Sequence, residues 1–405
     1  MTNKRILFVD DEASVLEGLE NLLRKQRRRW QMSFALGGEA ALAELQKAPF
    51  DVIVTDIRMP GMDGATLLHH VRERHPAVVR IVLSGHADRE AVIRAIPVAH
   101  QFLAKPCDGE VLRAVIERTC ELQMLLGDDT LREIVGRIEN LPCVPAVYHE
   151  LMQRVGDPTV GLAEVAGIVE KDTAMSAKIL QIVNSAYFGV RQPMSSVQQA
   201  VKYLGLELIK GMALTVQLFT TLGGHASLDQ LQRSSLLTAR VARRLVSGGD
   251  EKAAVNAFTA GLLHNVGTVV LIVGLPERFA QISREAQQSG RPTFLVEREL
   301  LGVTHAEIGG YLLGTWGLPF TVVEAVAQHH SPGRVAEGDL QVLAAVHVAE
   351  ALVEGVLVGP AAAQSLLDEA FLTKAGLMER MAGWRAIAEE ECSRGEDSSV
   401  KRAAS

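Results

Sequence analysis

Cysteine is scarce in this chain, because only four of its 405 residues are cysteine and no two of them form a CxxC pair. This spacing excludes a disulfide framework and a zinc knuckle, and it is typical of proteins from a reducing cytosol. No uninterrupted apolar run is long enough to span a bilayer, so we expect a protein that is not membrane-integral. The opening stretch MTNKRILFVDDE passes from a short apolar run straight into acidic residues, which is unlike a secretory signal and predicts no export.

An excess of basic residues is also missing: 41 Lys and Arg residues stand against 48 Asp and Glu residues, a formal net charge of −7. This balance argues against non-specific binding to nucleic acid. The basic patch at residues 24–29 is interpreted as a solvated helix end, and no helix-turn-helix pattern is recognisable, so DNA is not expected as a partner. With 48% hydrophobic and 22% charged residues, the composition is typical of a globular chain with two or three domains.

Residues 4–125 alternate short β-branched runs with helical periodicity, which predicts five βα units and a parallel, doubly wound sheet. The expected strands are 5–9, 30–36, 51–56, 78–84 and 100–105, and the expected helices are 13–27, 38–47, 64–74, 88–96 and 108–125. From about residue 130 onward, periods near 3.6 predict an all-helical region. We place the first domain at residues 1–126, a linker at 127–135, the helical domain at 136–385 and a disordered tail at 386–405.

Functional side chains are expected at the carboxyl ends of the strands in such a sheet. Asp10, Asp11 and Asp56 end the first and third strands, and three carboxylates at one edge would repel one another unless a hard cation such as Mg²⁺ neutralised them. Ser84 and Lys105 close the fourth and fifth strands. The set suits phosphoryl transfer to a carboxylate, although each aspartate alone is more typical of a helix cap or a turn.

The stretches VDDE (9–12), DIRMPGMDG (56–64), LSG (83–85) and KP (105–106) resemble the receiver domain of two-component response regulators, over about residues 3–125. The resemblance implies a flavodoxin-like fold in which Asp56 accepts the phosphoryl group and Lys105 contacts it. It implies a Mg²⁺ site made by Asp10, Asp11, Asp56 and the backbone carbonyl of Arg58. It also implies a switch pair, Ser84 and Phe102, and a cis peptide before Pro106.

The second region concentrates histidines in its helices, at His264, His305, His329-His330 and His347. Histidines on neighbouring helices suggest a metal site. A catalytic site for phosphate esters normally also needs carboxylates that hold the ion and orient a water molecule, so the accompanying residues decide the interpretation.

Residues 131–335 resemble the HD superfamily of metal-dependent phosphohydrolases, and more closely its HDOD branch. The supporting stretches are IENLPCVPAVYHEL (138–151), EKDTAMSAKILQIVNSAYFG (170–189), SSVQQAVKYLG (195–205), GLLHNVG (261–267) and HAEIGGYLLGTWGLP (305–319). Departures from the catalytic pattern are His264-Asn265 for a histidine-aspartate doublet, Ser234-Ser235 for a first histidine, and Glu350 for a final aspartate. Ser-Pro-Gly after His329-His330 also replaces the glycine-tyrosine-proline signature of cyclic-dinucleotide phosphodiesterases.

These departures should lower metal affinity. We therefore interpret His264, His305 and His329 as buried polar groups that satisfy one another. A vestigial metal site and residual hydrolase activity are the alternatives. Asn184-Ser185 with Tyr187 and Phe188 is interpreted as a helix cap with aromatic packing, or alternatively as part of a partner groove, and Trp316 as a core residue.

Together these patterns predict a cytoplasmic bacterial response regulator of a two-component phosphorelay. A histidine kinase or phosphotransfer protein would phosphorylate Asp56, and this would control a non-catalytic HDOD domain that binds a downstream protein. Mg²⁺ in the receiver is the expected cofactor, with none expected in the HDOD domain, and a homodimer is a further expectation from the resemblance. The alternative is a phosphorylation-gated, metal-dependent phosphodiesterase or phosphohydrolase.

Overall fold

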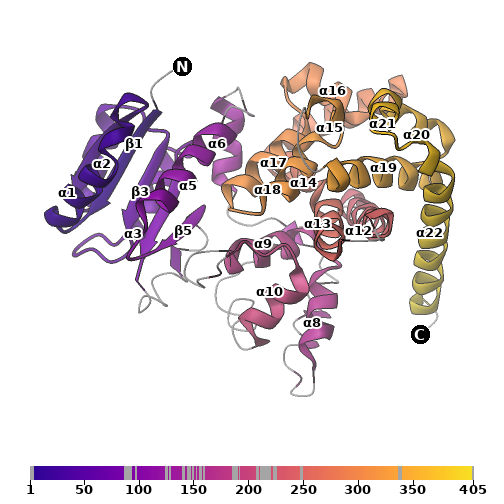
Figure 1. Cartoon of the computed structure of the whole chain (residues 1–405), viewed down its shortest axis with the longest axis horizontal. Coiled ribbons are helices and arrows are strands. Elements are labelled where there is room, and N and C mark those ends of the chain that lie inside the picture. Colours follow the sequence, from indigo (N-terminus) through magenta and orange to yellow (C-terminus); the bar gives the residue numbers. More distant parts are fainter. Residues whose placement is uncertain are drawn as a thin grey trace.

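The structure is a computed structural model that describes most of the chain (Figure 1). The described residues are 4–85, 94–95, 98–123, 126, 129–138, 142–143, 147, 150–151, 153–154, 157, 160–184, 190, 192–206, 209, 220–221, 226–246, 250–335 and 340–403. Ser185, Tyr187 and Phe188, and the expected helix at 88–96 apart from residues 94–95, lie outside these ranges.

The N-terminal region is a five-stranded parallel sheet with the strand order β2-β1-β3-β4-β5. Its strands are β1 (Lys4–Asp10), β2 (Trp30–Leu36), β3 (Val52–Asp56), β4 (Val79–Ser84) and β5 (Gln101–Ala104), and its helices include α1 (Ala13–Leu22), α2 (Gly38–Lys47), α3 (Gly64–Arg74) and α5 (Gly109–Leu122). Alternate strand residues face opposite sides of the sheet, so Leu7 and Ile53 join one apolar cluster while Phe8 and Val54 join another. The predicted doubly wound fold is confirmed.

One expected helix differs from the prediction at its end. The helix predicted over residues 13–27 stops at Leu22, and a short 3₁₀ helix, η1 (Arg24–Arg28), follows it. A run of cations can sit at such a helix end because it complements the carbonyl end of the helix dipole.

The second region is helical, as predicted. Its helices are α6 (Asp129–Arg137), α8 (Leu162–Val169), α9 (Thr173–Val183), α10 (Val197–Leu204), α12 (Ala226–Val246), α13 (Glu251–Leu263), α14 (Val266–Gly274), α15 (Pro276–Ser289), α16 (Thr293–Leu301), α17 (His305–Thr315), α18 (Phe320–Gln328), α19 (Leu340–Leu357), α20 (Pro360–Leu366), α21 (Glu369–Lys374) and α22 (Met381–Ala403). A two-residue parallel pair, β6 (Pro142–Cys143) with β7 (Thr220–Thr221), is an addition that the periodicity did not predict.

Two helical stretches are long and apolar enough to cross a membrane by length and composition. Residues 251–274 have a mean hydropathy of 1.7 and residues 340–357 one of 1.6, and within the fold 78% and 67% of these stretches are buried. Both lie in the interior of the helical bundle, where α13 and α19 pack against α12. Burial against other helices accounts for their apolar composition.

The linker and the tail differ from the predictions. Residues 129–135, which were expected in the linker, form α6 together with residues 136–137, and the Gly136 carbonyl accepts a hydrogen bond from Arg80 of the sheet region. Residues 386–394 are not a disordered tail, because they continue α22. Trp384, Ala388 and Cys392 recur at four-residue spacing and are buried, so they give this helix an apolar face that the local composition had concealed.

Candidate functional site

The predicted acidic edge is assembled at the carboxyl ends of the strands. Asp10 ends β1 and Asp56 ends β3, and the ammonium of Lys105, which follows β5, lies 2.9 Å from Asp10 Oδ2 and 2.6 Å from Asp56 Oδ1. The Lys105 amide donates to the carbonyl of Ser84 at the end of β4, which brings Ser84 to the same edge. Parallel pairing of four strands therefore gathers these residues as the sequence predicted.

Asp11 and Arg58 lie at the rim of this edge. Asp11 is exposed directly after β1, and the exposed Arg58 donates its backbone N–H to Asp56 Oδ2 at 3.2 Å. The carboxylates of Asp10, Asp11 and Asp56 do not form a tight cluster here, since Lys105 lies between two of them. The oxygen donors still suit a hard cation such as Mg²⁺, which would share their charge with Lys105.

Burial raises the pKa of Asp56, and the ion pair with Lys105 partly offsets that effect. Burial by itself would lower the pKa of Lys105, but hydrogen bonds and charge interactions with Asp56 and Asp10 raise it overall. The lysine is thus held as a cation beside the Asp56 carboxylate, whose pKa burial raises. This places a fixed positive charge where negative charge would accumulate during phosphoryl transfer.

Ser84 and Phe102 lie beside this edge in different surroundings, one with a polar group and one in the apolar core. Ser84 Oγ is buried and has no hydrogen-bond partner within the described part of the chain, so it is available to a new acceptor. Phe102 of β5 is buried in the larger apolar cluster. The Lys105-Pro106 peptide is cis, as the resemblance implied.

Gly64 is a part of this site that sequence reasoning did not single out. A Cβ atom at Gly64 would come within 2.1 Å of the Asp56 carbonyl oxygen, so only glycine lets α3 begin this close to the aspartate. Its place in the DIRMPGMDG stretch was the available signal.

The second group of predicted site residues is brought together in the helical region. His264 follows α13, His305 begins α17, His329 and His330 follow α18, and Glu350 lies on α19. Ligand atoms of His305, His329 and His330 all lie within 4.8 Å of one another, which no other group of three histidine, cysteine or acidic residues achieves in the described ranges.

One ring nitrogen of each of three histidines is held by a fixed acceptor. His264 Nδ1 lies 2.6 Å from the Gly261 carbonyl, and His329 Nδ1 lies 2.7 Å from the Val326 carbonyl. His305 Nδ1 lies 2.8 Å from Oε2 of Glu297, which also accepts the His305 backbone N–H. Because carbonyl and carboxylate oxygens only accept, the Nδ1 atoms carry protons and the Nε2 atoms face the cluster.

The Nε2 side of the cluster converges on Glu350. Its Oε2 lies 3.7 Å from His329 Nε2 and 3.7 Å from His330 Nδ1, while His330 Nε2 lies 3.1 Å from His305 Nε2. His329 Nε2 and His330 Nδ1 are buried and have no hydrogen-bond partner in the described part of the chain. The histidines therefore do not fully satisfy one another, which departs from the structural interpretation of the sequence.

Burial dominates the electrostatics of this cluster. It lowers the pKa of His264 to about 4 and holds the pKa values of His329 and His330 well below their usual range. It raises the pKa of Glu350 to about 8. Burial would also lower the pKa of His305, but the charge and hydrogen bond of Glu297 raise it instead.

Two substitutions noted in the sequence, at Asn265 and Ser234, change the hydrogen bonding around the cluster. The Asn265 amide lies 2.8 Å from His264 Nε2, so it donates to that nitrogen and occupies its lone pair. Ser234 donates to Glu354 at 3.0 Å, one turn after Glu350 on α19, and Ser235 is fully buried. Where the catalytic pattern has metal ligands, this chain has hydrogen-bonding groups.

Sequence reasoning missed Glu297, although it is almost completely buried and fixes His305 through two hydrogen bonds. The signal was an acidic residue inside the apolar run TFLVERELL, eight positions before the histidine. Nothing local in that run identified its partner, since the contact forms only when α16 and α17 pack together.

The two regions contact each other through β5, α5 and α6. Arg118 of α5 donates to the Leu318 carbonyl at 2.7 Å after α17, and Gln181 of α9 donates to the Ala99 carbonyl before β5 at 3.4 Å. Figure 1 shows α5 beside α17, and α6 contacts α3 of the sheet region and α14 of the helical region. Gly314 of α17 lies against Leu122 of α5, where an added Cβ would come within 2.6 Å of the leucine side chain.

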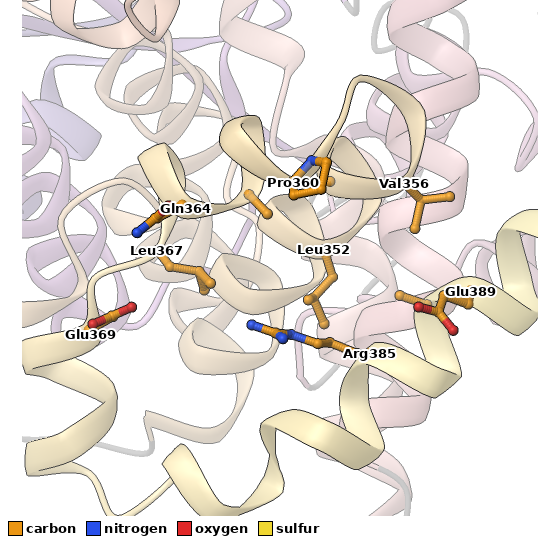
Figure 2. Close-up of a pocket in the computed structure, with 11 residues that line it drawn as sticks. Leu352, Val356, Pro360, Gln364, Leu367, Glu369, Arg385 and Glu389 are labelled. Carbon is orange, nitrogen blue, oxygen red and sulfur yellow. The ribbon is translucent and has the colours of Figure 1, made fainter.

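A separate cavity of about 480 Å³ lies between α19, α20 and α22 (Figure 2). Leu352, Val356 and Leu367 give it an apolar lining, and Arg385 and Glu389 lie at its edge. Its lining residues include no histidine or cysteine, so it lacks the nitrogen and sulfur donors of the histidine cluster.

Comparison with protein families agrees with the geometry of both sites. Residues 6–117 match the response regulator receiver domain, and residues 141–332 match the HDOD domain. The chain therefore contains a receiver domain of the kind found in response regulators. Its receiver domain is joined to an HDOD domain, as the sequence motifs indicated.

Individual relatives match only parts of the chain. An uncharacterized protein of Treponema pallidum is 27% identical over 226 residues, 55% of this chain and 44% of the relative. The hydrogenase transcriptional regulatory protein HoxA of Cupriavidus necator is 38% identical over 125 residues, 30% of this chain and 25% of the relative. The chain thus spans less than half the length of these curated relatives.

Two solved structures are similar over a larger share of the chain. The MmoQ response regulator of Methylococcus capsulatus is 24% identical with a TM-score of 0.46, covering 58% of this chain and 97% of that one. A virulence factor of Campylobacter jejuni is 20% identical with a TM-score of 0.49, covering 62% of this chain and 93% of that one.

Proposed function

We propose that Asp56 is the phospho-acceptor of a cytoplasmic phosphorelay and that its phosphorylation controls a non-catalytic, protein-binding HDOD domain. The observation that carries this proposal is the contact of α5 and of Ala99, just before β5, with the HDOD domain, because β5 carries Phe102 and leads directly to Lys105. A change at the acidic edge can therefore reach the interface through one short strand.

The chemistry uses the groups already described. A carboxylate oxygen of Asp56 attacks the phosphorus of a phosphohistidine on a histidine kinase or phosphotransfer protein, the P–N bond breaks, and the imidazole departs. Lys105 neutralises charge on the transferred oxygens. Asp10, Asp11, Asp56 and the Arg58 carbonyl would hold Mg²⁺, which supplies further charge neutralisation when bound.

Phosphorylation would change what the edge can bind. The new phosphoryl group carries close to two negative charges and three acceptor oxygens, and the unpartnered Ser84 hydroxyl can donate to one of them. Movement of Ser84 would open space beside Phe102 on the neighbouring strand. We infer that the β5 and α5 contact with α9 and α17 then loosens and exposes a face of the HDOD domain to a downstream protein.

Hydrogen exchange on the full chain tests this proposal. Acetyl phosphate with Mg²⁺ should decrease amide protection in α5 and in residues 313–318, and Asp56→Asn should abolish the change. An Asp51→Asn variant serves as the control, because Asp51 pairs with Lys4 at the opposite end of the sheet. Equal responses in the wild-type chain and Asp56→Asn would refute control through Asp56.

The alternative, a phosphorylation-gated metal-dependent phosphodiesterase or phosphohydrolase, is favoured by one observation, the clustering of His305, His329 and His330, two of which lie 3.7 Å from Glu350. Against it, Asn265 and Ser234 stand where the catalytic pattern has ligands. Turnover of a cyclic dinucleotide or nucleotide by the phosphorylated, metal-loaded chain would establish the enzyme. Failure of turnover in the presence of bound metal would remove it.

A further inference from the structure

We propose that His305, His329, His330 and Glu350 form a mononuclear site for a divalent transition ion of the zinc class in the HDOD domain. The unsatisfied atoms carry the argument. His329 Nε2 and His330 Nδ1 are buried and have no hydrogen-bond partner in the described ranges, and both lie 3.7 Å from the same Glu350 oxygen. Buried polar atoms without partners are uncommon because they lose water without replacement, and a bound ion would satisfy them.

The rings of the three histidines are held in fixed orientations. His305 and His329 are held through Nδ1, by a carboxylate in one case and a carbonyl in the other, so their Nε2 atoms face inward. This is the arrangement in which metal-bound histidines are usually fixed. The ring of His330 is stacked on Phe294 with 4.1 Å between ring centroids, which restricts its orientation.

His347 provides the contrast within the same bundle. Its Nδ1 donates to the His329 carbonyl at 2.7 Å, and its Nε2 accepts the Asp368 backbone N–H at 2.9 Å. Both nitrogens are satisfied by the backbone, so this histidine has no lone pair to offer. The difference between His347 and the cluster shows that burial of a histidine in this domain does not require an unsatisfied nitrogen.

The separations are close to those of a tetrahedral site. Ligand atoms at the usual zinc distances lie about 3.3 Å apart. Ligand atoms of His305, His329 and His330 all lie within 4.8 Å of one another, and Glu350 Oε2 is 3.7 Å from both His329 Nε2 and His330 Nδ1. Side-chain rotations that bring these atoms closer together would complete the coordination.

Charge and ligand type define the class of ion. Two carboxylates, Glu297 and Glu350, are buried in this cluster, and a divalent cation would balance their charge. Imidazole nitrogens with one carboxylate suit zinc, cobalt or nickel rather than Mg²⁺ or Ca²⁺, which prefer oxygen ligands. Asn265 keeps His264 outside the set by donating to its Nε2, so the site holds one ion rather than two.

Titration with Co²⁺ tests the site in the full-length chain, because the visible absorption of Co²⁺ reports its coordination. Excess Mg²⁺ is included to occupy the acidic edge of the receiver. We expect one equivalent of Co²⁺ with a tetrahedral spectrum, and at least a tenfold weaker affinity in His329→Gln and in Glu350→Gln. Glu297→Gln should weaken binding about tenfold or more by releasing His305.

His347→Gln is the matched control, since it removes a buried histidine of the same bundle that is not a ligand, and its Co²⁺ affinity should stay within about twofold of the wild type. Asn265→Asp should bind more tightly, because it adds a carboxylate and frees His264, and misfolding cannot mimic that gain. Absence of stoichiometric Co²⁺ from both the wild type and Asn265→Asp would overturn the site, as would equal losses in His329→Gln and His347→Gln. Asp56→Asn should retain Co²⁺, so failure of this site is distinguishable from failure of phosphorylation control.

Discussion

The contact between α6 and the sheet region gives the sharpest stability prediction. A Cβ atom at Gly136 would lie 1.9 Å from the Pro76 carbonyl oxygen, and 2.7 Å from its carbonyl carbon. Both atoms belong to backbone, so no side-chain rotation relieves the overlap. Gly136→Ala must therefore push α6 away from the loop that follows α3.

Gly136→Ala lowers the free energy of unfolding through the contacts that α6 loses. Displacing α6 lengthens the bond from Arg80, whose guanidinium donates to the Gly136 carbonyl at 2.7 Å. Loss of such a charge-assisted bond costs about 1.5–3 kcal/mol, and the overlap itself costs about 1–3 kcal/mol. Alanine recovers about 1 kcal/mol of helix propensity. We expect a net loss of about 1.5–5 kcal/mol in the free energy of unfolding.

Urea unfolding and hydrogen exchange of α6 measure this loss. Gly167→Ala in α8 is the matched control, because no atom lies within 4 Å of the added Cβ. That variant should gain about 0.5–1 kcal/mol, as expected when glycine is replaced inside a helix. A Gly136→Ala protein as stable as the wild type, with unchanged protection of α6, would refute the close approach of α6 to the sheet region.

Three further predictions concern other parts of the chain. Lys105→Met should slow labelling of Asp56 by acetyl phosphate at least tenfold, measured by intact mass, because it removes the cation that both carboxylates share. Burial, together with the charges of Arg80 and Lys178, holds the pKa of His100 well below its usual range. The unfolded chain therefore binds a proton below pH 6.5 that the folded chain does not, and stability should fall by up to about 1.4 kcal/mol per pH unit as pH decreases. The urea midpoint of His100→Gln should show a smaller slope between pH 6.5 and 5. Trp384→Ala should cost about 3–5 kcal/mol in thermal unfolding, since this ring is buried on the apolar face of α22.

The sequence predicted the sheet and its acidic edge well, because both depend on local patterns. β-branched runs fixed the strands, and parallel pairing then placed Asp10, Asp56 and Lys105 together without further information. Local patterns did not predict contacts between residues that are far apart in the sequence. Helix α6 was taken for a linker because the Gly-Asp-Asp break was visible, whereas the Arg80 contact that anchors the helix was not.

The histidine cluster shows a different limit. Motif comparison indicates which ligands of the catalytic pattern are replaced, but it could not show what the remaining groups do. The orientation of these histidine rings depends on the groups that accept their Nδ1 protons, such as Glu297 and the Val326 carbonyl. It also depends on the position of Glu350 beside them. These contacts arise from the packing of α16, α17, α18 and α19, which no single segment encodes.

Helix α17 connects the two sites physically. His305 begins it, and Gly314, near its end, lies against Leu122 of the receiver. An 11-residue helix of this kind moves largely as one body, about 16 Å long. If phosphorylation loosens the receiver contact, the position of His305 relative to His329 must change as well. Binding linkage is reciprocal, so Co²⁺ affinity should differ about five- to 150-fold between the phosphorylated and unphosphorylated chain, and bound Co²⁺ should shift the docking equilibrium by the same factor. Identical Co²⁺ affinities in the two states would show that α17 does not transmit the switch.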